Sequence, residues 1–197
     1  DQALAAIDPA ACELLPLLMR KQLVVHPEGD EDAHEYAFQH HLLHQVTYDS
    51  VLKLPKREGH ARVGAFWRAR AQATGPHDVD PTKCRALAEA QYHGCQSDPQ
   101  DHLVWFEAQF PHYFEAFATQ TLRPLVEQLA ALCEREFGAD DLRTARALTD
   151  LARVALMQGD AEPVPPLLQR ALAIQERSLG TDHADTALTL AAIGAYH

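Results

Sequence analysis

The 197-residue sequence lacks the features that most directly point to catalysis or to a membrane location. No apolar run approaches the roughly 20 residues that cross a bilayer, and no signal peptide opens the chain. The phosphate-binding loop GxxxxGK[ST] is missing. No Ser/His/Asp or Cys/His arrangement has the spacing of a nucleophilic site. We therefore expect no membrane contact, no enzymatic activity and no tight nucleotide binding by this chain alone.

The sequence also has few cysteines, and none of them form a CxxC pair. The four are scattered along the chain at Cys12, Cys84, Cys95 and Cys133. Scattered cysteines are typical of reduced structural thiols, so we predict a cytoplasmic location and no disulfide framework.

Positive charge is scarce relative to negative charge. The chain has 17 Lys and Arg against 28 Asp and Glu, a net charge of −11. Binding to a phosphate backbone normally needs clustered Lys and Arg, so this balance argues against a nucleic-acid partner.

No Met precedes Asp1, and the last residues, "LAAIGAYH", continue a helical pattern. We therefore expect the sequence to be a piece of a longer protein. Its apolar fraction of 47% and charged fraction of 23% are typical of a soluble globular chain.

The N-terminal pattern predicts the second half of a winged helix. Residues 9–20 have helical spacing, "QLVVH" (22–26) and "EYAFQ" (35–39) predict two strands, and a polar turn separates the strands. A DNA-binding winged helix commonly uses this turn near phosphates. Here the turn and its flank are acidic, at Glu28, Asp30, Glu31, Asp32 and Glu35. These charges would repel DNA.

The rest of the chain is predicted to be helical. The segment that follows the second predicted strand continues as a helix to about residue 52, and Pro55 begins another. "TGPHDVDP" (74–81) is a loop. Further helices are expected at 82–95, 99–118, 121–137, 141–158, 162–179 and 183–197. Gly138, Gly159 and Gly180 are expected to end three of them as C-terminal caps.

An internal repeat with an offset of 42 residues occupies the C-terminal part. Residues 131–148 align without a gap with residues 173–190. The identical pairs are Ala131/Ala173, Glu134/Glu176, Arg135/Arg177, Gly138/Gly180, Asp140/Asp182, Thr144/Thr186, Ala145/Ala187 and Leu148/Leu190, with Pro124/Pro166 on the same offset. A fixed period of this size predicts stacked helix-turn-helix units.

The stretch "LARVALMQGDAEPVPPLLQRALAIQERSLGTDHADTAL" resembles tetratricopeptide repeats in the 42-residue form of kinesin light chains. This resemblance implies an α-helical superhelix that binds protein or peptide partners. Contacts would lie on the inner faces of helices 141–158 and 183–197. Arg143, Arg146 and Arg153 could meet acidic groups there, and solvated surface charge is the alternative.

The stretch "FQHHLLHQVTYDSVL" (38–52) places three histidines within five positions. His40 and His44 have a spacing that can bind Zn²⁺ on a helix, with His34 and His41 as further candidates. Because no nearby pattern supplies the remaining ligands, we predict no metal site. A histidine that packs the strand against the helix is a further alternative for His40.

The same stretch resembles the end of the winged-helix domain in STAND ATPases, which are signal-transducing NTPases. The bacterial cyclase-linked form is Phe-x-His-x-Leu-x-x-x-Val-x-Tyr-x-x-Leu. It is matched by Phe38, His40, Leu42, Val46 and Tyr48, with Val51 in place of Leu. The resemblance implies that His40 senses the β-phosphate of ADP bound by an upstream ATPase domain of the same chain. His41 replaces the Asp of the related plant motif.

Together these observations predict a mainly α fold in which a small winged-helix remnant with a β-hairpin precedes a tetratricopeptide-like superhelix. The expected domains are 1–53 (winged helix), 54–118 (helical linker or hairpins) and 119–197 (repeats). The expected function is regulation and protein interaction within a bacterial STAND ATPase whose parent binds ADP or ATP and is linked to a cyclase or kinase domain. Self-association is an additional expectation. A stand-alone repeat scaffold and, less favoured, a DNA-binding regulator remain as alternatives.

Overall fold

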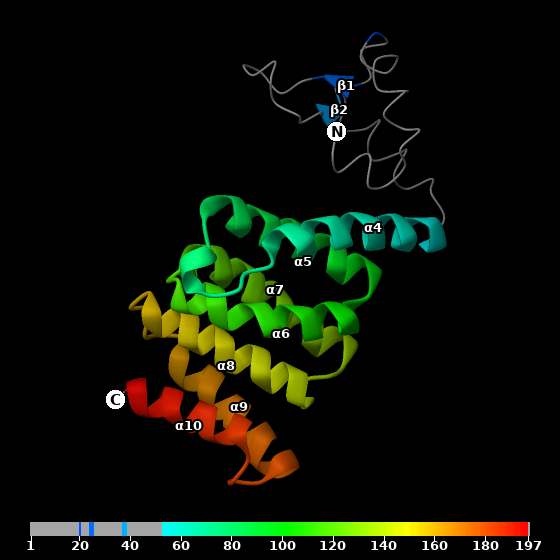
Figure 1. The fold of residues 1–197 in the computed structure, drawn as a ribbon. Helices are drawn as coiled ribbons and strands as arrows, with labels where there is room; N and C mark the ends of the chain where they lie inside the picture. The colour runs from blue at the N-terminus through cyan, green and yellow to red at the C-terminus, as the bar shows by residue number, and fades with distance from the viewer. Residues whose placement is uncertain (1–19, 21–23, 26–36, 39–52, 197) are drawn as a thin grey trace. The chain divides into compact units, whose positions relative to one another are not determined.

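The structure is a computed structural model that describes Arg20 and residues 24–25, 37–38 and 53–196 (Figure 1). The helix expected at 9–20, the acidic turn and the histidine-rich stretch at 39–52 therefore fall, except for Arg20, outside the described residues. No described helix is both long enough and apolar enough to cross a membrane.

Two short strands form an antiparallel pair. β1 (Val24–Val25) pairs with β2 (Ala37–Phe38), so that Val24 lies opposite Phe38 and Val25 opposite Ala37. Each strand lies inside a segment whose sequence predicts a strand. The winged helix around them remains a prediction.

The remaining described residues are mainly helical, as the sequence predicts. The elements are α4 (Lys53–Ala71), the 3₁₀ turn η1 (Pro76–Asp78), α5 (Pro81–Ser97), α6 (Pro99–Glu115), α7 (Thr119–Glu136), α8 (Leu142–Met157), α9 (Val164–Leu179) and α10 (Ala184–Tyr196). Each helix from α5 onward begins and ends within three residues of its expected bounds.

Local side chains account for these bounds. α5 and α6 each begin at a proline, whose fixed φ suits the first turn of a helix. Asp80 accepts a hydrogen bond from the Lys83 backbone N–H at 2.8 Å, as expected of an N-cap. Gly138, Gly159 and Gly180 have positive φ of 106°, 75° and 86°, and each stands where a helix ends. The prediction that these glycines act as C-terminal caps is therefore confirmed.

The chain divides into two compact units. The first contains residues 1–72 and 89–104, and the second contains residues 73–88 and 105–197.

In the first unit, α4 packs against parts of α5 and α6 through apolar and polar side chains. Val63 and Ala90 are buried. The Nδ1 atoms of His60 and His93 lie 2.8 Å apart, so one ring donates a hydrogen bond to the other. Burial lowers the pKa of His93 to about 4, with the neighbouring His60 as a second cause.

The second unit repeats one helical hairpin. α8 begins at Leu142 and α10 at Ala184, an offset of 42 that equals the sequence repeat. The turns are also equivalent, because Thr144 Oγ1 donates to Gly138 O at 2.8 Å and Thr186 Oγ1 donates to Gly180 O at 2.9 Å. The sequence repeat is therefore a structural repeat.

Neighbouring helices of the repeats pack in chain order, α7 on α8, α8 on α9 and α9 on α10 (Figure 1). α8 also contacts α10. One core cluster contains Ala152, Ala155, Val164, Leu168 and Ala192. The small alanines allow the helix backbones to approach closely.

A buried polar chain crosses this apolar core. The hydroxyl groups of Thr149 and Thr189 lie 2.8 Å apart, and Thr189 Oγ1 donates to Gln175 Oε1 at 2.7 Å. All three side chains are at most 2% exposed. Because buried polar groups are costly when they lack partners, these hydrogen bonds fix the relative positions of α8, α9 and α10.

Candidate protein-binding surface

The start of α8 places Arg143 in a tight turn. Asp141 is the N-cap, and its Oδ1 accepts a hydrogen bond from the Arg143 backbone N–H at 2.9 Å. The Arg143 guanidinium binds both oxygens of the same carboxylate, at 2.8 and 3.0 Å. Its central carbon lies 3.6 Å from the centre of the Phe137 ring. Arg143 therefore holds the turn together, and this bidentate contact lowers the pKa of Asp141.

Arg146 and Arg153 belong to a second group of charges, one and three turns further along α8. Arg146 pairs with Glu107 of α6 at 3.2 Å, and Arg153 pairs with Asp150 at 3.0 Å. Arg153 also lies over the Phe114 ring, 4.3 Å from its centre, and 5.5 Å from the centre of Phe110. The result is a surface strip in which two cations alternate with two carboxylates beside aromatic rings.

Burial is the main cause of the pKa shifts of the two carboxylates in this strip. It raises the pKa of Asp150 to about 6, although Arg153 and Arg146 oppose the shift. The pKa of Glu107 is raised for the same reason, with Arg146 opposing and Asp185 of α10 adding to it. Desolvation therefore outweighs ion pairing at both carboxylates.

The structure brings together two of the three arginines that the sequence singles out. Arg146 and Arg153 share the strip, whereas Arg143 lies with Phe137 at the turn. Arg146 has the most accessible side chain of the three, at 44% exposed. Each arginine already contacts a carboxylate of this chain, so an acidic partner would have to compete with that contact.

Sequence reasoning missed the carboxylates and aromatic rings of the strip. The spacing of Arg146, Asp150 and Arg153 at i, i+4 and i+7 places them on one helix face and could have indicated the α8 part. Glu107, Phe110 and Phe114 come from α6, and the sequence carries no signal that joins them to α8.

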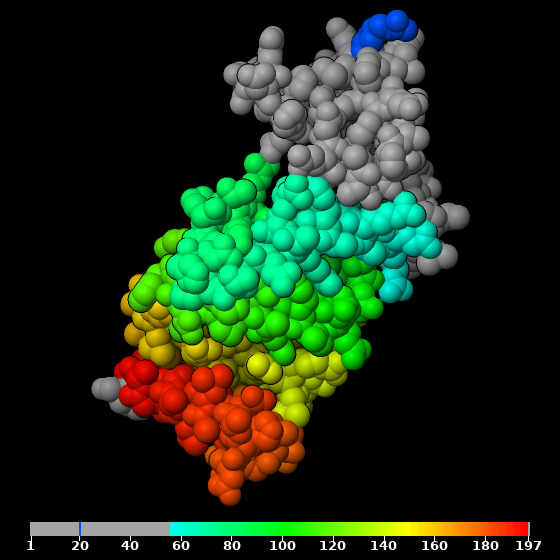
Figure 2. Space-filling model, viewed as in Figure 1, coloured from blue at the N-terminus to red at the C-terminus, as the bar shows by residue number. Residues whose placement is uncertain are grey.

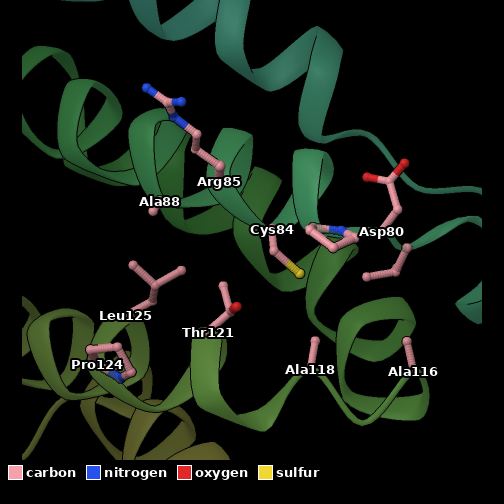
Figure 3. Close-up of a pocket in the computed structure, with 11 residues that line it drawn as sticks. Asp80, Cys84, Arg85, Ala88, Ala116, Ala118, Thr121, Pro124 and Leu125 are labelled. Carbon is pink, nitrogen blue, oxygen red and sulfur yellow. The ribbon is translucent and has the colours of Figure 1, made fainter. Parts of the chain in front are cut away.

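A separate open cavity of about 670 Å³ lies in the second unit (Figure 3). Its lining residues are Val79, Asp80, Pro81, Cys84, Arg85, Ala88, Ala116, Ala118, Thr121, Pro124 and Leu125. In Figure 3 the Arg85 guanidinium extends away from Pro124 and Leu125. The walls are mostly apolar, which suits an apolar side chain better than a phosphate or a metal ion.

Within the described residues, no group of three or more His, Cys, Asp or Glu side chains could hold a metal ion. His34, His40, His41 and His44 lie outside those residues, so the nucleotide-sensing role implied for His40 and the zinc alternative both stay sequence predictions. No protein-family model and no curated protein sequence matches the chain.

Proposed function

We propose that this chain is a non-catalytic regulatory and protein-interaction region of a larger signal-transducing STAND ATPase. The winged-helix segment at 1–53 relays nucleotide state, and the tetratricopeptide-like helices bind protein partners. The observation that carries the interaction role is the repeat of the α7–α8 hairpin by α9–α10 with the same turn contacts. Stacked hairpins present equivalent helices side by side and so create an extended surface for a partner segment.

The partner surface in this proposal is the charged strip on α6 and α8. An acidic side chain from a partner would replace Glu107 at the exposed Arg146. Phe110 and Phe114 hold Arg153 in place through cation–π contacts, so its charge is preorganised. The exchange leaves Glu107 without its cation, which offsets part of the gain and makes the binding weak and reversible.

The nucleotide part of the proposal rests on the family resemblance of residues 38–52. In this view ADP or ATP is held by the ATPase domain of the parent protein, and His40 donates an imidazole N–H to a phosphate oxygen. Binding of ADP and binding of a partner would favour different conformers and so shift their populations. The scattered cysteines favour a reducing, cytoplasmic location.

The interaction role is tested with a fluorescently labelled hexaglutamate peptide and the 197-residue chain at about 150 mM salt, which screens the repulsion between the peptide and the net charge of −11. We expect weak binding that Arg146→Gln reduces by roughly 5–10-fold, because a charge-assisted hydrogen bond is lost. Arg135→Gln is the matched control, since Arg135 is also exposed and paired with a neighbouring carboxylate, Glu136, but lies on α7. Equal losses in both variants, or no loss in Arg146→Gln, would contradict the proposed surface.

The nucleotide role is tested on a longer protein in which an ATPase domain precedes this sequence. The protein is denatured, and released ADP and ATP are quantified by chromatography. We expect bound ADP in the unmodified protein and loss or faster exchange of that ADP in His40→Ala. His44→Ala, which changes a histidine outside the motif position, should retain ADP. Absence of nucleotide from all three proteins would rule out the ATPase role.

A stand-alone repeat scaffold is the second candidate, and the same structural repeat supports it. Binding of the acidic peptide without any nucleotide in the longer protein would favour this scaffold. A DNA-binding regulator is disfavoured by the net charge of −11 and by the acidic sequence of residues 28–35.

A further inference from the structure

The charged strip on α6 and α8 holds its two carboxylates in confined positions. The Asp150 side chain is 13% exposed and lies between Arg146 and Arg153 along α8. The Glu107 side chain is 28% exposed and pairs with Arg146 at 3.2 Å. In the space-filling view α6 (green) and α8 (yellow) meet at the surface (Figure 2). Two cations balance two carboxylates, so the strip has no net charge while all four groups are ionised.

An acidic partner would upset this balance. A partner carboxylate that binds Arg146 takes the cation away from Glu107 and brings a further negative charge close to it. Glu107 would then be a partly buried carboxylate without a cation. Such a charge is costly, and the carboxylate avoids this cost when it takes up a proton.

The neighbouring charges decide how easily the two carboxylates take up a proton. Within the part of the chain that the structure describes, Arg146 and Arg153 of α8 favour the charged forms, whereas Asp185 of α10 opposes the charge on Glu107. Glu107 in turn opposes the charge on Asp150. Because Arg146 acts on both carboxylates, a partner that engages Arg146 weakens the support of both.

Burial adds to this effect, because it disfavours the charged form of a carboxyl group. It raises the pKa of Asp150 to about 6, and it raises the pKa of Glu107 as well. A carboxyl with a raised pKa takes up its proton at a higher pH than an exposed one. The strip therefore reaches its protonated form in mildly acidic solution, where exposed carboxylates are still charged.

We propose that the charged strip takes up a proton when it binds an acidic segment, so that its affinity for acidic partners rises as the pH falls. The proton goes to the carboxylates of Glu107 and Asp150, which then compete less for Arg146 and leave the strip with a net positive charge. This inference rests on the proposed function, since it concerns the regulation of the same surface. Uptake of one proton limits the gain in affinity to about tenfold per pH unit.

The test uses a fluorescently labelled peptide of six cysteic acid residues, whose sulfonates keep their charge throughout, at about 150 mM salt. We expect the dissociation constant to fall by about 5–20-fold between pH 7.5 and pH 5.5. Glu107→Gln and Asp150→Asn imitate the protonated carboxyls. Each should bind about 3–10-fold more tightly than the unmodified chain at pH 7.5 and change less with pH. Circular dichroism checks the fold of each variant, and either one suffices for the test.

Two control variants separate the strip from the rest of the chain. The 12 histidines also gain positive charge as the pH falls, and this effect is common to all variants. Glu136→Gln changes the net charge by the same amount as Glu107→Gln, but Glu136 lies on α7 and pairs with Arg135. His183→Gln removes the histidine that lies 3.9 Å from Asp185. Both controls should keep the pH response of the unmodified chain.

Calorimetric titration near pH 6.5 in two buffers of different ionisation enthalpy counts the protons taken up on binding. We expect uptake by the unmodified chain and a smaller uptake by Glu107→Gln and Asp150→Asn. Equal pH responses in the unmodified chain and both variants would overturn the proton coupling. The surface itself would then still stand if Arg146→Gln weakens binding at pH 7.5. Absence of binding at both pH values would contradict the surface and the coupling together.

Discussion

At the scale of single residues, the two units hold ionisable groups whose pKa values are shifted for the same reason but with opposite consequences. In the first unit, burial lowers the pKa of His93 to about 4 and that of His102 to about 3. In the second unit, burial raises the pKa of Asp150 to about 6. In each case burial disfavours the charged form.

These shifts predict how stability depends on pH. Between about pH 4 and 6.5, the unfolded chain binds more protons at His93 than the folded chain does, so this group makes the free energy of unfolding rise with pH. Between about pH 4 and 6, the folded chain binds more protons at Asp150, so this carboxyl makes the free energy of unfolding fall with pH. The two contributions oppose each other over the same range.

Urea unfolding at pH 4.5, 5.5 and 7 separates the two contributions. We compare the change in the free energy of unfolding between pH 4.5 and 7 with that of the unmodified chain. We expect this change to be smaller by about 1–2 kcal/mol in His93→Gln and more positive by about 1–2 kcal/mol in Asp150→Asn. Loss of the hydrogen bond to His60 lowers the free energy of unfolding of His93→Gln by a similar amount at each pH. A comparison of the slopes of this free energy against pH therefore removes that cost. Unchanged slopes in both variants would show that neither shift exists in solution.

At the scale of helices, the contact of α5 with α6 depends on Gly94. A Cβ atom at this position would lie 2.3 Å from Nδ1 and 3.0 Å from Cβ of His102. His102 is fully buried and cannot move aside easily. The two helix backbones therefore approach closely because position 94 has no side chain.

We predict that Gly94→Ala destabilises the chain by about 1–3 kcal/mol, because overpacking outweighs the gain in helix propensity. Gly59→Ala is the control. Gly59 lies within α4, and a Cβ atom there would meet nothing within 4 Å. This change should stabilise the chain by about 0.5–1 kcal/mol. Midpoints of thermal or urea unfolding give both values, and equal effects in the two variants would contradict the close approach.

The bounds of the helices could be predicted from the sequence because their signals are local. Pro81 and Pro99 begin helices, and glycines with positive φ end three others. Contacts between helices could not be predicted in the same way. The pair of His60 and His93 joins residues 33 apart, and no spacing rule connects two separate helices before their packing is known.

At the scale of the whole molecule, the repeat was the most informative sequence signal. A fixed offset of 42 predicts two equivalent hairpins, and the turns at Gly138 and Gly180 confirm them. The repeat could not predict the candidate site. Glu107 lies outside the repeated residues, and Arg146 and Arg153 have no arginine at their counterparts, Leu188 and Ala195. Repeated residues build the scaffold, while the charged strip comes from residues that differ between the repeats.

The order in which the helices pack has a kinetic consequence. From α7 to α10 each helix contacts its nearest neighbours along the chain, so few contacts require a long loop to close. Folding rates rise as the sequence separation of contacts falls, because less chain entropy is lost before contacts form. The α7–α10 part of the chain is therefore suited to fold one hairpin after another, at the rate at which a ribosome delivers them.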